Sequence, residues 1–202
     1  MKKSLLAVIL AVAMVAPVFA QKGDMSINGK LGLGVSNNLN YHANGHHGLP
    51  DGLSQGYDME MPILIGAEFF YGLMDMLSVG AGINYNFGSD TKANMEGSKL
   101  EAKTVNFYLA VKPEAKIESD IFTSLYLIGQ IGGSSITAES DGRSETADMG
   151  IYLGFGAGTI IKDCVIVELL ISSANGSLSI NGKTSDLQYT ATTINVGYKF
   201  AL

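Results

Sequence analysis

The segment TINVGYKFAL (residues 193–202) alternates between polar and apolar side chains. A period of two places alternate residues on opposite faces of a β-strand. The segment therefore predicts a strand that ends at the last residue, with one face in apolar surroundings. The apolar and aromatic face holds Ile194, Val196, Tyr198, Phe200 and Leu202, and the opposite face holds Thr193, Asn195, Gly197 and Lys199.

The same alternation recurs along the rest of the chain and predicts seven further strands. We expect them at about residues 25–41, 59–71, 76–87, 100–112, 121–134, 146–161 and 164–173. In the first of them, the pattern places Leu33, Val35 and Leu39 on the apolar face. The strand at 121–134 is ambiguous because residues 125–128 are apolar on both faces. We favour Leu125, Leu127 and Ile131 on the apolar face, because this choice turns Gln130 to the polar face.

The expected connections alternate between long and short. The long ones are residues 42–58, 88–99, 135–145 and 174–186, and the short ones lie near 72–75, 113–120 and 162–163. Bacterial membrane barrels show this asymmetry, with short periplasmic turns and longer outer loops. Only helices and closed barrels satisfy every backbone group in lipid. The sequence therefore predicts an all-β fold, an eight-stranded antiparallel up-and-down transmembrane β-barrel.

The amino terminus has the layout of a secretory signal peptide. Lys2 and Lys3 precede an apolar run over residues 4–19, and Val18 and Ala20 are small or apolar residues at the two recognition positions of a cleavage site after Ala20. A transmembrane anchor is the alternative, but the run is shorter than the roughly 20 residues that span a bilayer as a helix. We expect residues 1–20 to be a cleavable signal and residues 21–202 to form the barrel domain.

Composition and charge fit an exported barrel. The chain holds 13 basic and 19 acidic residues, and removing Lys2 and Lys3 leaves 11 basic residues, a net charge of −8. This balance argues against nucleic acid as a partner, which would call for a basic patch. Charged residues make up 16% of the chain, below the roughly 25% of soluble domains.

A soluble secreted barrel, such as a lipocalin-like ligand binder, is the main alternative. Its polar face would meet water and should be roughly 25–35% charged. Here the polar face is mostly Gly, Ser, Asn and Thr. Aromatic residues also gather near both ends of the predicted apolar face, as at membrane interfaces. They are Tyr41, Tyr85 and Phe87 at one end, and Phe69, Tyr71, Tyr198 and Phe200 at the other.

The whole predicted mature chain resembles the small outer-membrane β-barrel proteins of the OmpA/OmpX type, a porin-like barrel family. The match rests on the signal, the alternating strands, the loop asymmetry and the strand 194–202. That strand resembles the carboxyl-terminal assembly signal of the family, although Leu202 is last where Phe is usual. The resemblance implies a place in the cell outer membrane. It also implies outer-membrane lipid or lipopolysaccharide, the barrel-assembly machinery and periplasmic chaperones as partners.

Several charged residues fall on the predicted inward face. An eight-stranded barrel is just wide enough for its own side chains, so buried charges should pair. We expect a salt-bridged network that plugs the barrel, with Glu68 or Glu168 reaching Lys30 or Lys199. The candidates are Lys30, Glu60, Glu68, Lys112, Asp148, Glu168 and Lys199.

Other candidate sites are weaker. His42, His46 and His47 with Asp51 could bind zinc, but a solvated Gly-rich loop is the better interpretation. His42, Ser89 and Asp90 could imitate the catalytic set of a lipid A palmitoyltransferase. We expect no metal, no cofactor and no enzyme activity. Cys164, the one cysteine, begins an apolar strand, and we interpret it as a packing residue rather than a reactive thiol.

Function is therefore expected from the scaffold. The first hypothesis is a structural or surface-interaction protein that presents its loops, 42–58, 88–99, 135–145 and 174–186, to a surface ligand. A small-solute or ion channel is the second hypothesis, and a lipid A-modifying enzyme the third.

Overall fold

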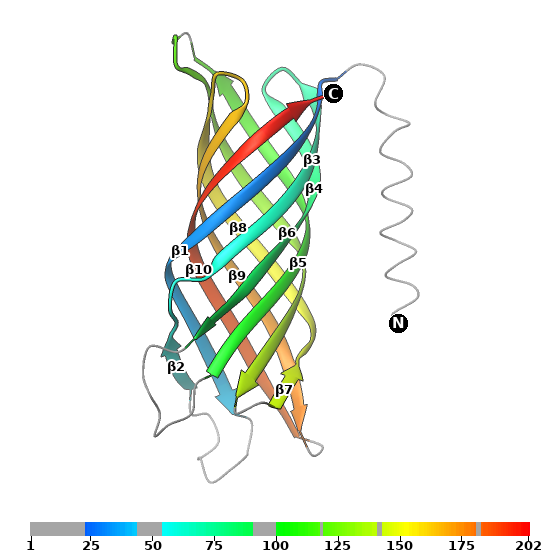
Figure 1. Ribbon diagram of the computed structural model, residues 1–202. Helices are drawn as coiled ribbons and strands as arrows, with labels where there is room; N and C mark the ends of the chain where they lie inside the picture. Colours follow the sequence, from blue (N-terminus) through cyan, green and yellow to red (C-terminus); the bar gives the residue numbers. More distant parts are fainter. Residues whose placement is uncertain (1–22, 44–53, 91–99, 118, 141–142, 181–182) are drawn as a thin grey trace.

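The computed structural model is an antiparallel β-barrel (Figure 1). It describes residues 23–43, 54–90, 100–117, 119–140, 143–180 and 183–202. The predicted signal peptide lies outside these ranges. Among the described residues, no helix is long and apolar enough to cross a membrane.

Eight long strands form the wall. They are β1 (Met25–Ala43), β3 (Ile63–Met74), β4 (Leu77–Asp90), β5 (Leu100–Lys116), β6 (Phe122–Ser140), β8 (Asp148–Ile161), β9 (Val165–Ile180) and β10 (Lys183–Ala201). Each pairs antiparallel with its neighbour, and β10 pairs with β1 to close the sheet. Two short strands, β2 (Ser54–Asp58) and β7 (Arg143–Thr146), pair with β1 and β6. This confirms the predicted eight-stranded antiparallel barrel.

The strands are strongly staggered. Following paired residues from Lys30 through β3, β4 and β5 leads to Ser134 of β6. Following them the other way, through β10, β9 and β8, leads to Ser124, ten residues away on the same strand. A stagger of this kind is what closes a tilted sheet into a barrel.

The two ends of the barrel differ, and we name them by their connections. The turn end holds the short connections, the start of β1 and the carboxyl terminus (Figure 1). One of its turns has Lys162 and Asp163 at positive φ, and the Cys164 N–H donates to the Ile161 carbonyl at 3.2 Å. Two consecutive positive φ values are those of the tight type I′ hairpin turn. The other end, the loop end, holds β2, β7 and the ends of the longest strands.

An apolar belt surrounds the turn-end part of the wall. On β10 it consists of Ile194, Val196, Tyr198 and Phe200, whose side chains are 45–55% exposed. Leu125, Leu127 and Ile131 are exposed as well, while Gln130 is buried, so the favoured register of that strand is confirmed. Aromatic pairs lie near both limits of the belt: Tyr198 with Phe200 toward the turn end, and Tyr85 with Phe87 toward the loop end.

The strands continue past the belt at the loop end, and here the predicted loop boundaries are wrong. Residues 135–145 and 174–186 were expected to be loops, but most of them belong to β6, β7, β9 and β10. β1, β6 and β10 are each 19 residues long, whereas crossing a bilayer takes about 9–11 residues per strand. The barrel therefore has a β-sheet extension beyond the apolar belt.

The extension has an apolar core of its own. Side chains from β1, β5, β6, β10 and the segments that flank β2 and β7 are turned inward and almost fully buried. They include Leu39, Met59, Ala102, Ile136, Ala147 and Leu187. Leu39 was predicted to face outward. A bulge between Gly34 and Ser36 leaves Val35 and Ser36 both exposed, and this extra residue reverses the faces of the rest of β1.

Candidate functional site

Lys30 lies at the centre of the interior and contacts two glutamates. Its Nζ is 2.8 Å from Glu68 Oε1 and 2.8 Å from Glu168 Oε1. The three residues come from β1, β3 and β9, and they are 7%, 3% and 1% exposed. Two carboxylates share one ammonium group, so this layer of the barrel holds an excess of negative charge that only hydrogen bonds can offset.

Three hydrogen-bond donors surround the Glu68 carboxylate. The Tyr108 hydroxyl donates to Oε1 at 3.0 Å, and the Gln130 amide donates to the same atom at 3.2 Å. Asn28 donates to Oε2 at 3.4 Å. Hydrogen bonds to a charged acceptor are stronger than those between neutral groups. The Glu68 carboxylate is therefore held by hydrogen bonds from three strands, β1, β5 and β6.

Glu168 is held in the same way from the other side of the barrel. Tyr126 donates to Oε2 at 3.0 Å, and Asn195 donates to Oε1 at 3.1 Å. Tyr152 then extends the network, since its hydroxyl donates to Gln130 Oε1 at 2.8 Å. We call the set of Lys30, Glu68, Glu168 and these donors the interior network. It crosses the barrel from wall to wall.

The tyrosines of the interior network lie opposite glycines. Tyr108 pairs in register with Gly82, and Tyr126 pairs with Gly158. A Cβ placed at either glycine would be 2.5–2.6 Å from the ring atom Cζ of its tyrosine. The glycines therefore provide the space in which the rings lie flat across the neighbouring strand. Tyr108 and Tyr126 were not among the predicted network residues, although their inward parity and the glycines that face them indicate this role.

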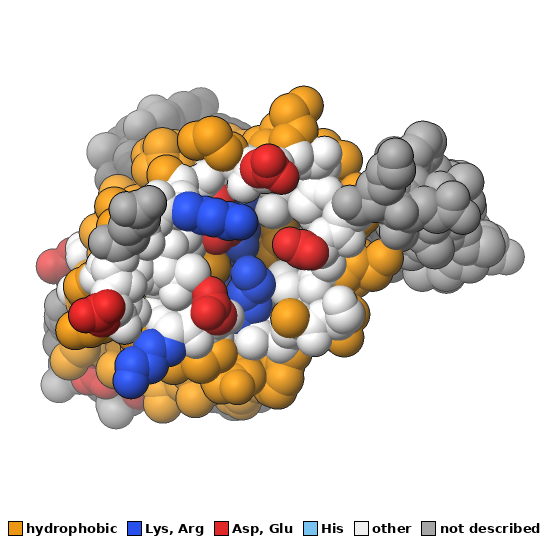
Figure 2. All heavy atoms as spheres, turned by 90° about the horizontal axis from the view of Figure 1, so that it is seen from above, with side chains coloured by type: hydrophobic (Ala, Val, Ile, Leu, Met, Phe, Trp, Pro, Cys, Tyr) orange, Lys and Arg blue, Asp and Glu red, His pale blue; other side chains and the backbone are white. Residues whose placement is uncertain are grey.

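A second cationic site lies nearer the turn end. Lys112 is buried and its Nζ is 3.4 Å from Glu114 Oε2. It also lies 4.6 Å from the centroid of the Phe70 ring, a cation–π contact. Viewed from the turn end, charged side chains gather within the barrel mouth and apolar side chains surround it (Figure 2). Lys199, also predicted to be inward, is half-buried at this end.

Two predicted interior residues lie elsewhere. Glu60 is exposed, because β3 begins only at Ile63, after Pro62, and residues 60–62 belong to no strand. Asp148 is exposed because a bulge between Met149 and Tyr152 changes the face on which the start of β8 lies. Both predictions assumed that side chains alternate strictly between the two faces of the strand. That alternation does not hold in these two irregular segments.

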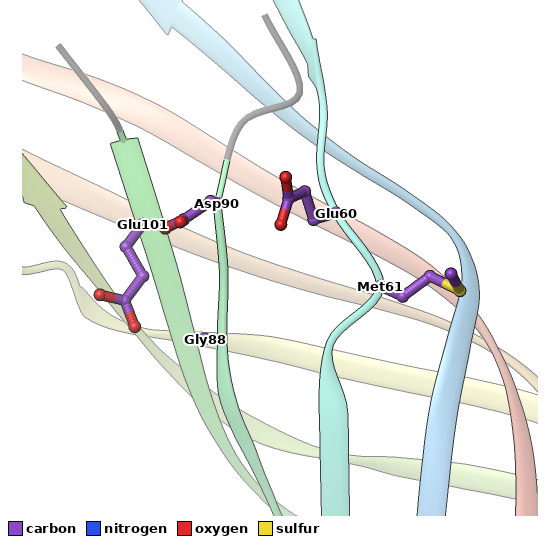
Figure 3. A pocket seen from close by; sticks show the side chains of 5 residues that line it. All are labelled: Glu60, Met61, Gly88, Asp90 and Glu101. Carbon is purple, nitrogen blue, oxygen red and sulfur yellow. The ribbon is translucent and has the colours of Figure 1, made fainter. Parts of the chain in front are cut away.

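Glu60 instead lines an open hollow at the loop end, where Asp90 and Glu101 are also found (Figure 3). Glu60 projects toward β4 and Met61 the opposite way. Beside the hollow, Lys103 contacts Glu139 at 3.1 Å and Glu101 at 3.2 Å. Hydrogen bonds to Glu139 and then Glu101 raise the pKa of the Lys103 ammonium group. Within the described ranges, no group of three His, Cys, Asp or Glu residues is arranged to hold a metal ion.

The remaining sequence candidates are only partly within the described residues. His46, His47 and Asp51 lie outside them, and the side chains of Tyr41, His42 and Ser89 are not described. The histidine and palmitoyltransferase-like sets therefore stay untested. Cys164 is half-buried next to the turn at Lys162 and Asp163, with Sγ 4.0 Å from the Ile161 carbonyl oxygen.

The interior network is suited to closing the lumen and holding the wall together. Lys30 contacts both carboxylates, and the tyrosine and amide donors link them to β1, β5, β6 and β10. Toward the loop end the polar layer continues: Asn106 donates to Asn84 at 2.6 Å and Asn86 donates to Tyr189 at 2.8 Å. Beyond that layer comes the apolar core of the extension.

Comparison with known proteins identifies the architecture. The model of one protein family, described as an outer membrane protein beta-barrel domain, matches residues 4–200. No curated protein matches the chain.

Solved structures give a consistent result. One is Ail, the attachment invasion locus protein of Yersinia pestis, in complex with the heparin analogue sucrose octasulfate. It is 12% identical, the alignment covers 89% of this chain and 100% of that chain, and the TM-score is 0.52. Neisserial surface protein A is 10% identical over 89% of this chain and 100% of its own, with a TM-score of 0.50. At these identities the likeness shows the fold alone.

Proposed function

The chain belongs to the outer membrane protein beta-barrel domain family and is an outer-membrane protein, and from that premise we propose that it is a non-catalytic surface-interaction barrel. In this family of barrels the short turns face the periplasm and the longer loops face outward. The turn end is then periplasmic, and the extension projects from the cell surface. The proposal is that the extension is a rigid platform that presents its loops for recognition.

The observation that carries the proposal is the packed core of the extension. Leu39, Ile136 and Leu187 are at most 4% exposed, although they lie beyond the apolar belt. Burying such side chains stabilises each by roughly 1.5–3 kcal/mol relative to exposure. A set of loops with no core would be mobile. A packed extension fixes the positions of the strand ends at the loop end, and loops on a rigid scaffold are where recognition commonly lies.

The interior supports a closed barrel rather than a channel. A conducting pore needs a continuous water-filled path, but Lys30 contacts both Glu68 and Glu168 across the lumen. Planar-bilayer recordings of the folded protein test this point, with a known porin as positive control. We expect no unitary conductance at high protein density. Reproducible conductance steps would support a channel and contradict the closed barrel.

Recognition by the loop end is tested by adhesion. Proteoliposomes carrying the barrel are applied to immobilised bacterial envelopes and to host-cell surfaces, with the segments 44–53 and 91–99 intact or shortened. We expect binding to fall when these segments are shortened and to persist when exposed Lys116, at the turn end, is changed to Ala. Equal binding by intact and shortened proteins would contradict a recognition role. A change in lipid A mass on addition of the protein would contradict the non-catalytic part of the proposal.

A further inference from the structure

The outward face of the barrel changes from apolar to polar side chains where the extension begins. On β10 the outward residues Ile194 and Val196 are succeeded, toward the loop end, by Thr192, Thr190 and Gln188. On β9 Leu169 and Ile171 are followed by Ser173 and Asn175. The polar side chains thus begin directly at the edge of the lipid-facing surface.

Six of these side chains form a compact patch on β9, β10 and β1. Ser173, Thr190 and Asn38 pair in one row, and Asn175, Gln188 and Asn40 pair in the next. All six are exposed or half-buried, and none carries a charge. We call this set the amide–hydroxyl patch.

The amide–hydroxyl patch keeps much of its hydrogen-bonding capacity. Only two long contacts involve its side chains among the described residues. The Gln188 amide donates to the Ser173 hydroxyl at 3.4 Å, and the Thr190 hydroxyl donates to the backbone carbonyl oxygen of Asn38 at 3.5 Å. The backbone groups of these strands are used by the sheet. The carboxamides of Asn38, Asn40 and Asn175 therefore offer both donors and acceptors to whatever lies beside the wall.

The rest of the extension wall is chemically different. On β5 and β6 the outward side chains include the ionic ladder of Glu101, Lys103 and Glu139. On β8 they include Met149, which is 54% exposed, and Asp148. The six patch residues are therefore an uncharged group on one side of the barrel, and the charged side chains nearest to them are acidic: exposed Asp58, which pairs with Asn38, and exposed Asp186 on β10.

We propose that the amide–hydroxyl patch binds the sugar headgroups of glycolipids in the outer leaflet of the membrane that surrounds the barrel. Sugar hydroxyls are neutral and both donate and accept hydrogen bonds, as do carboxamides and hydroxyls. Recognition of lipid phosphates would instead call for Lys or Arg, and the patch has neither. The patch is continuous with the lipid-facing belt and is directed sideways, so a lipid anchored beside the wall presents its sugars to it.

The test uses the full-length barrel folded in phospholipid nanodiscs with increasing fractions of lipopolysaccharide. The apparent affinity for lipopolysaccharide is measured from the glycolipid retained per barrel. It is compared with that for lipid A without core sugars and for soluble delipidated polysaccharide. The variant Asn40→Ala/Gln188→Ala removes two amides of the patch. The matched control Ser135→Ala/Thr137→Ala removes two polar groups from the outward face of β6. Folding is checked by the gel-mobility shift on heating, and Asn175→Ala serves if the double variant does not fold.

We expect the wild type to prefer lipopolysaccharide to lipid A. The double variant should weaken lipopolysaccharide binding by about fivefold or more, since each lost neutral hydrogen bond changes affinity by about that factor. The control should change it by less than about twofold on the same scale. Three results would overturn the proposal: unchanged affinity in the patch variants, equal binding of lipid A, or equal binding of soluble polysaccharide. None of them bears on whether the loops recognise a surface, so the adhesion test remains independent.

Discussion

Replacing Lys30 with Met tests the charge arrangement of the interior network. Lys30 is the ammonium group within 2.8 Å of both Glu68 and Glu168. The substitution leaves two buried carboxylates with hydrogen bonds but no adjacent cation. Removing one partner of a buried ion pair costs about 3–5 kcal/mol. We expect Lys30→Met to lower the free energy of unfolding by that amount.

The glutamate variant separates charge from packing. Glu68→Gln leaves one carboxylate for one ammonium group, and the Gln carbonyl can still accept from Tyr108 and Gln130. Its cost should be about 1 kcal/mol, the scale of one neutral hydrogen bond. Because two carboxylates contact one lysine, we expect Lys30→Met to lower the free energy of unfolding far more than Glu68→Gln does. Lys116→Met, at an exposed lysine, is the matched control and should be neutral.

The assay is urea unfolding of the barrel in lipid vesicles, followed by circular dichroism and by gel mobility. Both probes should give the same transition if the barrel unfolds in one step. The reasoning fails if Lys30→Met costs no more than Lys116→Met. It also fails if Glu68→Gln costs as much as Lys30→Met, because the network would then depend on geometry rather than on charge balance.

Three further changes test other parts of the barrel. Gly158→Val should displace the Tyr126 ring from Glu168 and destabilise the barrel by about 1–3 kcal/mol in the same urea titration; Ala157→Val, on the outward face of the same strand, should not. Ile136→Asp should place a charge in the extension core. In vesicles, added protease should then cut β6 near residue 136 while the apolar belt stays protected. Protease resistance equal to that of the wild type would argue against a packed extension. Phe200→Ser with Leu202→Ser should stall insertion while export continues, seen as periplasmic accumulation in cell fractionation, and normal outer-membrane levels would contradict the assembly role of this strand.

The sequence was sufficient for the fold where alternation is regular. On β10 the outward set from Ile194 to Phe200 and the inward Asn195 follow a strict period of two. The pairing of Lys30 with Glu68 and Glu168 also follows from inward parity, since a charge inside a narrow barrel must find a partner. Which donors complete the network does not follow, because it depends on the stagger that brings Tyr126 and Gln130 of β6 level with Glu168 and Glu68.

Parity counting failed at irregular positions. The bulge at Gly34 and Ser36 turned Leu39 inward, and the irregular start of β8 left Asp148 outside. A bulge adds one residue to one strand, and a single added residue reverses every later face. The sequence carries no strong mark of such an insertion.

The extension was missed for a different reason, and here the sequence did hold the signal. On β10 the apolar residues occupy even positions from Ile194 onward, but Leu187, Tyr189 and Ala191 occupy odd positions. No bulge intervenes on this strand, so the same parity faces inward throughout. Within lipid the outward face must be apolar. Beyond lipid the outside is water, so apolar residues turn inward as in a soluble barrel.

Along a strand, the apolar residues therefore switch from the outward to the inward positions at the membrane boundary. On β10 the change falls between Ala191 and Ile194, and on β9 the outward face changes between Ile171 and Ser173. Polar outward positions that follow such a change indicate a continuing strand in water, not the start of a loop. Applied to residues 174–180 and 183–190, this criterion predicts strand rather than loop, and it places the amide–hydroxyl patch at the level where lipid headgroups begin.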